Sequence, residues 1–517
     1  MAPQTFPLYG YERFFAMNPK TSAKLAHIMT VRGDIPALLT HLPTAVLATF
    51  NLHPRMRTAL LPGHSPLKAM VCPTLVDLTE LKSLYQVVER NDEYESSLWM
   101  RDVEAECEIP FNREQDLPFA IRIFVDKSSS NSPTFARIVL FADHYMSDTT
   151  SGTIILNSIL QNATTTAAMK NATAGSGANA PTISTQELPL RASLYECMHW
   201  VNPWIGILNE VVSKWFIEPM FNFDHSGFTP FLPVDTSSQQ DFCGQPPETS
   251  NKSSALFSQG NAENMQRALA RCKAEGASFE GALIAASIMA FGLTKYNGRL
   301  RTASTTPVQL KMDVTCDMRD HLDHTNFSKD EHAVGMYSTA ANLVFTSSKG
   351  VDVHSIRFWD LARKADHEVQ CLVLNHELKL QSMYVHELLN AENTESTLKV
   401  QNCMINDTTI SNCDAYPFPH SVVLGDGGSS KVEIETIHVY NSLPSLAPAT
   451  MLFASAVTCF NYSMMYKVPQ EVAKDLFHWY VQSVEHIGMY NEEDTLVEAS
   501  ETFTATSAVE VVPLASQ

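Results

Sequence analysis

The chain has 517 residues, of which 44% are hydrophobic and 18% are charged. This composition is typical of a globular chain that buries a large core, and it excludes a mostly disordered chain. With 36 Lys and Arg against 56 Asp and Glu, the formal net charge is −20. Nonspecific binding to nucleic acid is therefore not expected, because such binding needs clustered cations.

The sequence also restricts where the protein is expected to work. The first ten residues lack the charged and apolar segments of a signal peptide. The longest apolar runs, residues 281–293 and 447–460, are shorter than the roughly 20 residues that span a bilayer. Its ten cysteines form no CxxC pair. We therefore expect a cytoplasmic protein with reduced thiols and no transmembrane segment.

In the first half, residues 23–32 predict a strand, and Asp34 with Pro36 predicts the start of a helix that runs to about residue 51. Pro43 inside that helix predicts a kink or a late start. Residues 74–90 predict a second helix. Residues 117–125 and the almost continuously apolar residues 135–142 predict two strands, as a hairpin or with the second strand buried at the centre of a sheet.

After the helix near Thr153, residues 161–187 are rich in Ala, Thr, Asn, Gly and Ser, which predicts a flexible linker. Helices are expected at residues 262–275, 278–295, 352–373 and 470–488, the second of them deeply buried. A strand is expected at residues 306–318 and several strands within residues 402–460. The acidic, small-residue tail at residues 491–517 predicts disorder.

A polar loop follows the apolar strand at residues 135–142 and precedes a helix that begins near Thr153. Of the 18 histidines, His144 in this loop is the one followed four residues later by an aspartate, Asp148. One such match is about what chance gives, but its place between a buried strand and a helix is typical of catalytic loops. A neutral histidine can act as a general base. A histidine held by a local carboxylate, with only a structural role, fits this segment equally well.

Several short segments, in order along about 470 residues, resemble the HxxxD acyltransferase superfamily, which includes chloramphenicol acetyltransferase, condensation domains and alcohol O-acetyltransferases. The segments are the HYMSD loop at residues 144–148, HPRMR at 53–57, the helix pair at 268–291, DMR at 317–319, ISN at 410–412 and FNYS at 460–463. Their shared order is more specific than any single motif.

The resemblance implies an α/β fold of two chloramphenicol-acetyltransferase-like lobes, each a mixed sheet flanked by helices. We place the lobes at residues 1–190 and 191–490, with the active site in a tunnel between them. It further implies acyl transfer from an acyl-CoA co-substrate to a small alcohol or amine acceptor, with no permanently bound cofactor, and we expect a monomer. His144 would be the general base. Asp148 would face away from substrate and pair with Arg319, with Asp317 beside it as further support.

Two positions depart from the family pattern, since Asp143 replaces its first histidine and Thr149 replaces the glycine after the aspartate. Two alternatives therefore stay open, namely a condensation-like enzyme that uses a carrier-bound thioester and an inactive binding protein with the same fold. CoA carries phosphates, so its use predicts a local patch of Lys and Arg at the tunnel mouth. His321 and His324 with neighbouring aspartates indicate a solvated loop, and no metal site is expected.

Overall fold

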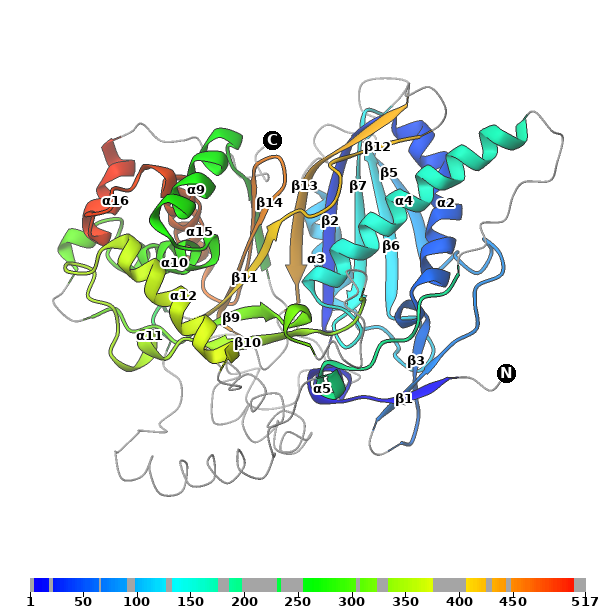
Figure 1. Ribbon diagram of the computed structural model, residues 1–517, viewed down its shortest axis with the longest axis horizontal. Helices are drawn as coiled ribbons and strands as arrows, with labels where there is room; N and C mark the ends of the chain where they lie inside the picture. The colour runs from blue at the N-terminus through cyan, green and yellow to red at the C-terminus, as the bar shows by residue number, and fades with distance from the viewer. Residues whose placement is uncertain are drawn as a thin grey trace.

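The computed structural model describes residues 4–17, 22–64, 67–90, 98–126, 133–174, 186–197, 230–233, 254–303, 307–322, 333–374, 406–424, 430–442 and 448–505. These residues form two lobes that lie side by side, each built on a six-stranded sheet with helices against it (Figure 1). The α/β class and the two-lobe architecture expected from the sequence are therefore confirmed.

Most helices and strands of the N-terminal lobe lie in the first two hundred residues. In chain order they are β1 (Thr5–Pro7), α1 (Gly10–Ala16), β2 (Lys24–Gly33), α2 (Ile35–Leu52), η1 (Pro54–Arg57), β3 (Thr58–Leu61), β4 (Lys68–Val71), β5 (Tyr85–Arg90), α3 (Leu98–Glu108), β6 (Phe119–Asp126), β7 (Phe135–Asp143), α4 (Thr149–Ala174) and α5 (Leu194–Cys197). Strands β1, β4 and β3 form a small separate sheet.

The remaining elements belong mainly to the C-terminal lobe. They are β8 (Ser254–Gln259), α9 (Ala262–Glu275), α10 (Phe279–Lys295), η4 (Leu300–Thr302), β9 (Met312–Asp317), η5 (Arg319–His321), β10 (Ser338–Asn342), α11 (Val344–Ser348), α12 (Phe358–Leu374), β11 (Thr408–Ala415), β12 (Ser421–Val423), β13 (Lys431–Asn441), β14 (Thr450–Ala456), β15 (Phe460–Tyr466), α15 (Gln470–Glu485), η6 (Ile487–Met489) and α16 (Leu496–Ala505). The sheet of this lobe has the order β10-β9-β11-β14-β15-β8.

Local sequence explains the elements that lead to the site. Strand β7 is buried along most of its length because it lies between β2 and β6, both antiparallel to it, as its apolar run predicted. Helix α2 begins where expected, since the Asp34 carboxylate accepts a hydrogen bond from the Ala37 amide at 3.0 Å. The helix then continues past Pro43 to Leu52, so a late start is not observed.

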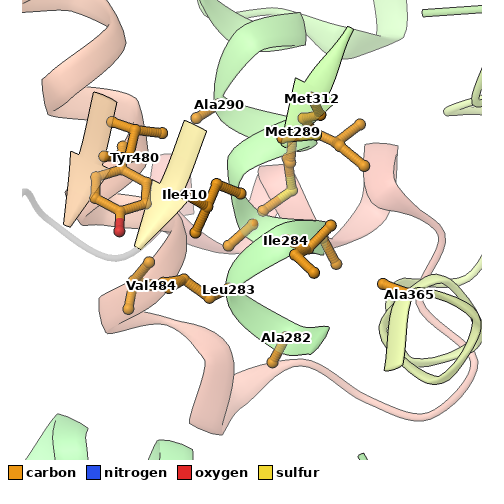
Figure 2. Close-up of a cluster of buried hydrophobic side chains, with 14 of the residues drawn as sticks. Ala282, Leu283, Ile284, Met289, Ala290, Met312, Ala365, Ile410, Tyr480 and Val484 are labelled. Atoms are coloured by element: carbon orange, nitrogen blue, oxygen red, sulfur yellow. The ribbon is translucent and has the colours of Figure 1, made fainter. Parts of the chain in front are cut away.

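The core of the C-terminal lobe forms around α10, the helix that the sequence predicted to be buried. Side chains on α10 pack against the β11 residue Ile410 and the α15 residues Tyr480 and Val484 (Figure 2). Every residue of α10 from Gly281 to Leu293 is buried. This helix therefore forms a rigid support behind the central strands β9 and β11.

The boundary between the lobes is less simple than a division at residue 190. Strands β12 and β13 come from the C-terminal half of the chain, but they complete the N-terminal sheet, whose order is β12-β13-β2-β7-β6-β5 (Figure 1). β13 pairs with β2 from Val432 opposite Gly33 to Asn441 opposite Leu25. The assignment of residues 191–490 to one lobe is thus wrong for β12 and β13, and β13 pairs with a strand about 400 residues earlier in the chain.

An apolar cluster joins the two lobes behind the site. It combines Val103 of α3 and Phe141 of β7 with Phe257, Phe453 and Met465 from the C-terminal sheet. These side chains are nearly or fully buried. Removal of their surface from water stabilises the lobes as one unit.

Two segments expected to be irregular are helical instead. Helix α4 continues through residues 161–174, and Ala163 and Ala167 are buried in the same core as α2. The many small residues of this segment suggested a linker, but small side chains such as these two alanines also allow α4 to approach α2 closely. The rest of the predicted linker, residues 175–185, lies outside the described residues.

The tail prediction is also wrong for residues 491–505. There α16 buries Leu496 and Ala499 against the C-terminal core. Residues 506–517 lie outside the described part of the chain.

The expected helix at residues 74–90 is wrong as well. This segment forms turns followed by β5, which pairs in parallel with β6. Its apolar residues have helical spacing, but its second part, Tyr85–Arg90, forms backbone hydrogen bonds with β6. This part contains two valines, which favour strands. Pairing with a strand more than thirty residues further along the chain decides the structure here.

Among the described residues, α2 is long and apolar enough to cross a membrane by length and composition. The consecutive helices α9 and α10 would pass the same test together, but they meet at a bend of 107°. The buried face of α2 packs on α4 and the sheet, as does a core helix of a globular lobe.

Candidate active site at the junction of the lobes

His144 is the first residue after β7. Its backbone amide donates to the Ala23 carbonyl at 2.8 Å, which ties the start of the loop to the segment before β2. Its Nδ1 lies 2.8 Å from the Ser147 carbonyl oxygen. A carbonyl can only accept a hydrogen bond, so Nδ1 carries the proton and Nε2 keeps its lone pair. This tautomer is the one that a general base at Nε2 needs.

The surroundings of the imidazole favour its neutral form. The Phe15 ring of α1 stacks on it, with 4.1 Å between ring centroids and 15° between planes. Burial lowers the pKa of His144, while the hydrogen bond to Ser147 and the charge of Asp148 partly oppose this shift. The net direction is downward, so the ring is neutral and can accept a proton at neutral pH.

The carboxylate of Asp148 is not available to His144, because it accepts hydrogen bonds from other groups. Arg319 from η5 of the opposite lobe donates to both of its oxygens at 3.0 Å each. The backbone amides of Ser151 and Tyr337 donate to it at 2.8 Å each. The predicted ion pair between Asp148 and Arg319 is therefore confirmed, and the geometry of Asp148 is that of a residue that holds the loop in place.

Asp317 extends this network. It accepts hydrogen bonds from the Arg319 side chain at 2.9 and 3.0 Å and from the Arg319 amide at 3.0 Å. Thr150 at the start of α4 donates to it at 2.7 Å. Asp148, Arg319, Asp317 and Thr150 thus form a chain of polar contacts that crosses between the lobes beside the loop.

Asp143, which replaces the first histidine of the family pattern, has its own partner. Arg113, in the segment after α3, donates through Nε to Oδ2 at 2.7 Å and through Nη2 to Oδ1 at 3.2 Å. Both side chains are about 1% exposed. Arg113 is not among the residues predicted from the sequence, because its polar neighbours suggest an exposed loop. The only available signal was indirect, since a carboxylate at the end of a buried strand needs a cationic partner.

Thr149, which replaces the family glycine, is the first residue of α4. Its carbonyl accepts a hydrogen bond from Nε2 of the buried His27 on β2 at 3.0 Å. The close approach is instead made at Gly152, where an added Cβ would lie 2.1 Å from the His27 ring. Glycine is thus required at position 152, three residues after Thr149 on the same helix.

A cleft of about 1040 Å³ lies between the lobes next to this network. Its lining includes three threonines of α4, the aromatic residues Phe279, Tyr416 and Phe418, and the charged or titratable residues Glu280, Asp317, Arg319, Asp320 and His321. Thr149 lines the cleft, whereas His144 is not among its lining residues. Arg319 is the one arginine or lysine of this described lining, and Asp148 and Asp317 already engage it.

No metal site forms among the residues that the structure describes, where no group of three His, Cys, Asp or Glu side chains is arranged to hold an ion. His321 and Asp320 lie on η5 at the cleft. Asp323 and His324 of the same motif lie outside the described residues.

Comparison with solved structures gives the fold independently of the motifs. TRI3 trichothecene 15-O-acetyltransferase from Fusarium sporotrichioides is similar over 93% of this chain and 95% of its own, with a TM-score of 0.65 and 12% identity. The condensation domain of the monacolin K polyketide synthase MokA is similar over 95% of this chain and 99% of its own, with a TM-score of 0.59 and 13% identity. The chain has the condensation-domain fold.

The epimerization domain from the third module of tyrocidine synthetase B shares that fold, with a TM-score of 0.58 and 9% identity over 97% of this chain and 98% of its own. No protein-family model and no curated protein sequence matches the chain. The solved structures therefore confirm the fold that the resemblance implied.

Proposed function

We propose that this protein is an acyltransferase that moves an acyl group from a thioester to an alcohol or amine, with His144 as the general base. The observation that supports this most directly is the tautomer of His144, which leaves Nε2 free to accept a proton on a loop held from both sides by ion pairs. The condensation-domain fold and its occurrence in an O-acetyltransferase support the same reaction class.

The proposed reaction is one direct transfer. Nε2 of His144 accepts the proton of the acceptor hydroxyl or amine as its oxygen or nitrogen attacks the thioester carbonyl carbon. The carbon–sulfur bond then breaks, and the proton passes from Nε2 to the leaving sulfur, which departs as a thiol. Asp148 and Asp143 take no proton in this scheme, because each is engaged by an arginine.

For the donor we propose acyl-CoA, as in the alcohol O-acetyltransferases that the sequence resembles. The described lining of the cleft does not suit the nucleotide end of CoA, which carries negatively charged phosphates. The carboxylates of this lining outnumber its one arginine, Arg319, which is already paired with Asp148. We therefore propose that the cleft receives the body of a neutral or cationic acceptor, whose reacting group extends beyond the lining residues to reach His144. The thioester would reach His144 from another direction. The same charge pattern keeps the carrier-bound thioester as the second candidate, because a phosphopantetheine arm carries a single phosphate.

The test is release of free thiol from a panel of acyl-CoAs and acyl-pantetheines mixed with alcohols and amines. Loss of a general base typically lowers a rate by a factor of about 10²–10⁴, so His144→Ala should lower thiol release by at least about 100-fold. His354→Ala, at an exposed histidine far along the chain near α12, is the matched control and should leave the rate unchanged.

Equal rates for wild type and His144→Ala would overturn the assignment of the base. Release from pantetheine thioesters alone would favour the carrier-dependent candidate. No release from any donor, with all variants folded, would favour an inactive binding protein.

A further inference from the structure

We propose that Arg113 is a positioning residue for the transfer, which acts on His144 through the carboxylate of Asp143. This inference rests on the proposed role of His144 as the base. Arg113 compensates the negative charge directly beside that base and fixes the end of β7 from which the catalytic loop begins.

The position of Arg113 is well determined by the chain around it. Its own carbonyl accepts a hydrogen bond from the Leu60 amide at 2.7 Å, at the end of the small sheet. The backbone amide of Asp143 donates to the Pro118 carbonyl at 2.8 Å. Asp143 is therefore held by its side chain to Arg113, which is itself tied to β3, and by its backbone to Pro118. His144 is the next residue in the chain.

The contact is built as a buried ion pair. Both partners are about 1% exposed, and two hydrogen bonds join them in the geometry that arginine forms with a carboxylate. Solvent screens such a charge weakly, so the charge of Asp143 would act on its neighbours more strongly once Arg113 no longer offsets it.

The charges near His144 are arranged in compensated pairs. On its own loop, Asp143 faces Arg113 and Asp148 faces Arg319. Each carboxylate favours the protonated imidazole, and its arginine offsets that effect.

Other titratable groups near the loop add no free charge. On β2, Lys24 lies opposite Asp143 in the strand pairing and binds Glu106, and burial lowers the pKa of His27 to about 4, so that ring is neutral. From the loop itself, Tyr145 is buried with a raised pKa and is also neutral. On α1, Glu12 is paired with Arg55. Removal of Arg113 would leave Asp143 as the one uncompensated charge among these described groups.

The test follows the imidazole itself as well as the reaction. In the full-length Arg113→Met variant, we expect the pKa of His144, measured by NMR titration of ring-labelled histidine, to rise by about one pH unit. The acid limb of kcat/KM should move upward by the same amount. In Arg113→Met/Asp143→Leu, where an apolar pair replaces the ion pair, both values should return towards wild type, since such replacements are often tolerated.

Arg32→Met is the control, because Arg32 forms an exposed ion pair with Glu435 at the far end of β2. It should change neither the titration nor the rate. If Arg113→Met does not fold, Arg113→Gln removes the charge while it keeps a hydrogen-bond donor for Asp143, and the same upward shift is expected.

A titration of His144 that is identical in wild type and in the folded Arg113 variant would overturn the proposal. If wild type transfers no acyl group, the proposed function fails, but the NMR titration still decides whether Arg113 controls His144. A loss of activity in the double variant, with the pKa of His144 unchanged in both Arg113 variants, would assign the ion pair a purely structural role.

Discussion

At the scale of single residues, the candidate base is defined by its neighbours more than by its own identity. His144 is one of 18 histidines. What separates it is a carbonyl that fixes its tautomer, an aromatic ring stacked on its face, and carboxylates on both sides that are engaged by arginines. These contacts make the ring neutral and leave Nε2 as its free basic atom.

Gly152 shows how closely the start of α4 is packed. In an ordinary helix, Gly→Ala stabilises by about 1 kcal/mol. Here the new Cβ would lie 2.1 Å from the His27 ring, so we expect Gly152→Ala to destabilise the protein by about 1–3 kcal/mol, as overpacking does. The measurement is the midpoint of denaturant unfolding.

The matched variant Gly152→Ala/His27→Ala removes the ring that would clash. Its midpoint should exceed that of His27→Ala alone, because the gain in helix propensity is then no longer opposed. A single Gly152→Ala variant as stable as wild type would contradict the packing seen at His27.

At the scale of elements, the crossover strand β13 depends on one glycine of β2. Gly33 has φ +130°, and an added Cβ would lie 2.1 Å from the Lys431 carbonyl oxygen on β13. Backbone strain of about 1–2 kcal/mol and overpacking of about 1–3 kcal/mol both apply. We expect Gly33→Ala to lower the free energy of unfolding by about 2–5 kcal/mol, measured by denaturant titration.

Gly63 provides the control for this prediction. It also has a positive φ, +73°, but an added Cβ there meets no atom within 4 Å. Gly63→Ala should therefore show the backbone strain alone, about 1–2 kcal/mol. Equal effects of the two substitutions would mean that β13 moves away from β2 at little cost.

Local pattern predicted the elements whose structure depends on local sequence. The apolar run of β7, the Asp34 cap of α2, and the bounds of α9, expected and observed at residues 262–275, needed no distant partner. The errors at residues 74–90 and 161–174 arose where pairing with β6 or packing on α2 decides the outcome. Neither partner is visible in the local sequence.

The candidate site divides in the same way. The pairing of Asp148 with Arg319 followed from the resemblance, because both residues belong to shared motifs. Arg113 and His27 belong to none, and they contact the two positions where this chain departs from the family pattern, Arg113 at the Asp143 carboxylate and His27 at the Thr149 carbonyl. Contacts of this kind depend on three-dimensional proximity, which a single sequence does not contain.

At the scale of the whole molecule, three kinds of contact make the lobes one unit. β13 crosses from one half of the chain into the sheet of the other, an apolar cluster fills the space between the sheets, and Arg319 joins the two lobes at the loop that carries His144. Of these three contacts, the ion pair is the one that contains a titratable carboxyl group, that of Asp148, so it is the one that responds to pH.

The last prediction concerns stability in acid. Burial alone would raise the pKa of Asp148, but the charge of Arg319 and the hydrogen bonds from Arg319, Ser151 and Tyr337 lower it below its ordinary value. A carboxyl group whose pKa is lower in the folded state stabilises that state at pH values above its unfolded pKa of about 3.9. This contribution is lost as the pH falls through the lower, folded pKa.

Asp148→Asn should therefore be less stable than wild type at pH 7, by about 3–5 kcal/mol, because it leaves the Arg319 guanidinium without its buried partner. The difference should shrink steadily below about pH 4, where wild type loses the same contribution. Denaturant unfolding of both proteins from pH 7 to pH 3 measures the difference at pH 7 and its decrease below pH 4.

Glu501→Gln, in the exposed pair with Arg301, serves as the control and should follow wild type throughout, since exposed pairs contribute little. Parallel curves for Asp148→Asn and wild type across this range would show that the ion pair between the lobes does not set the acid stability of the molecule.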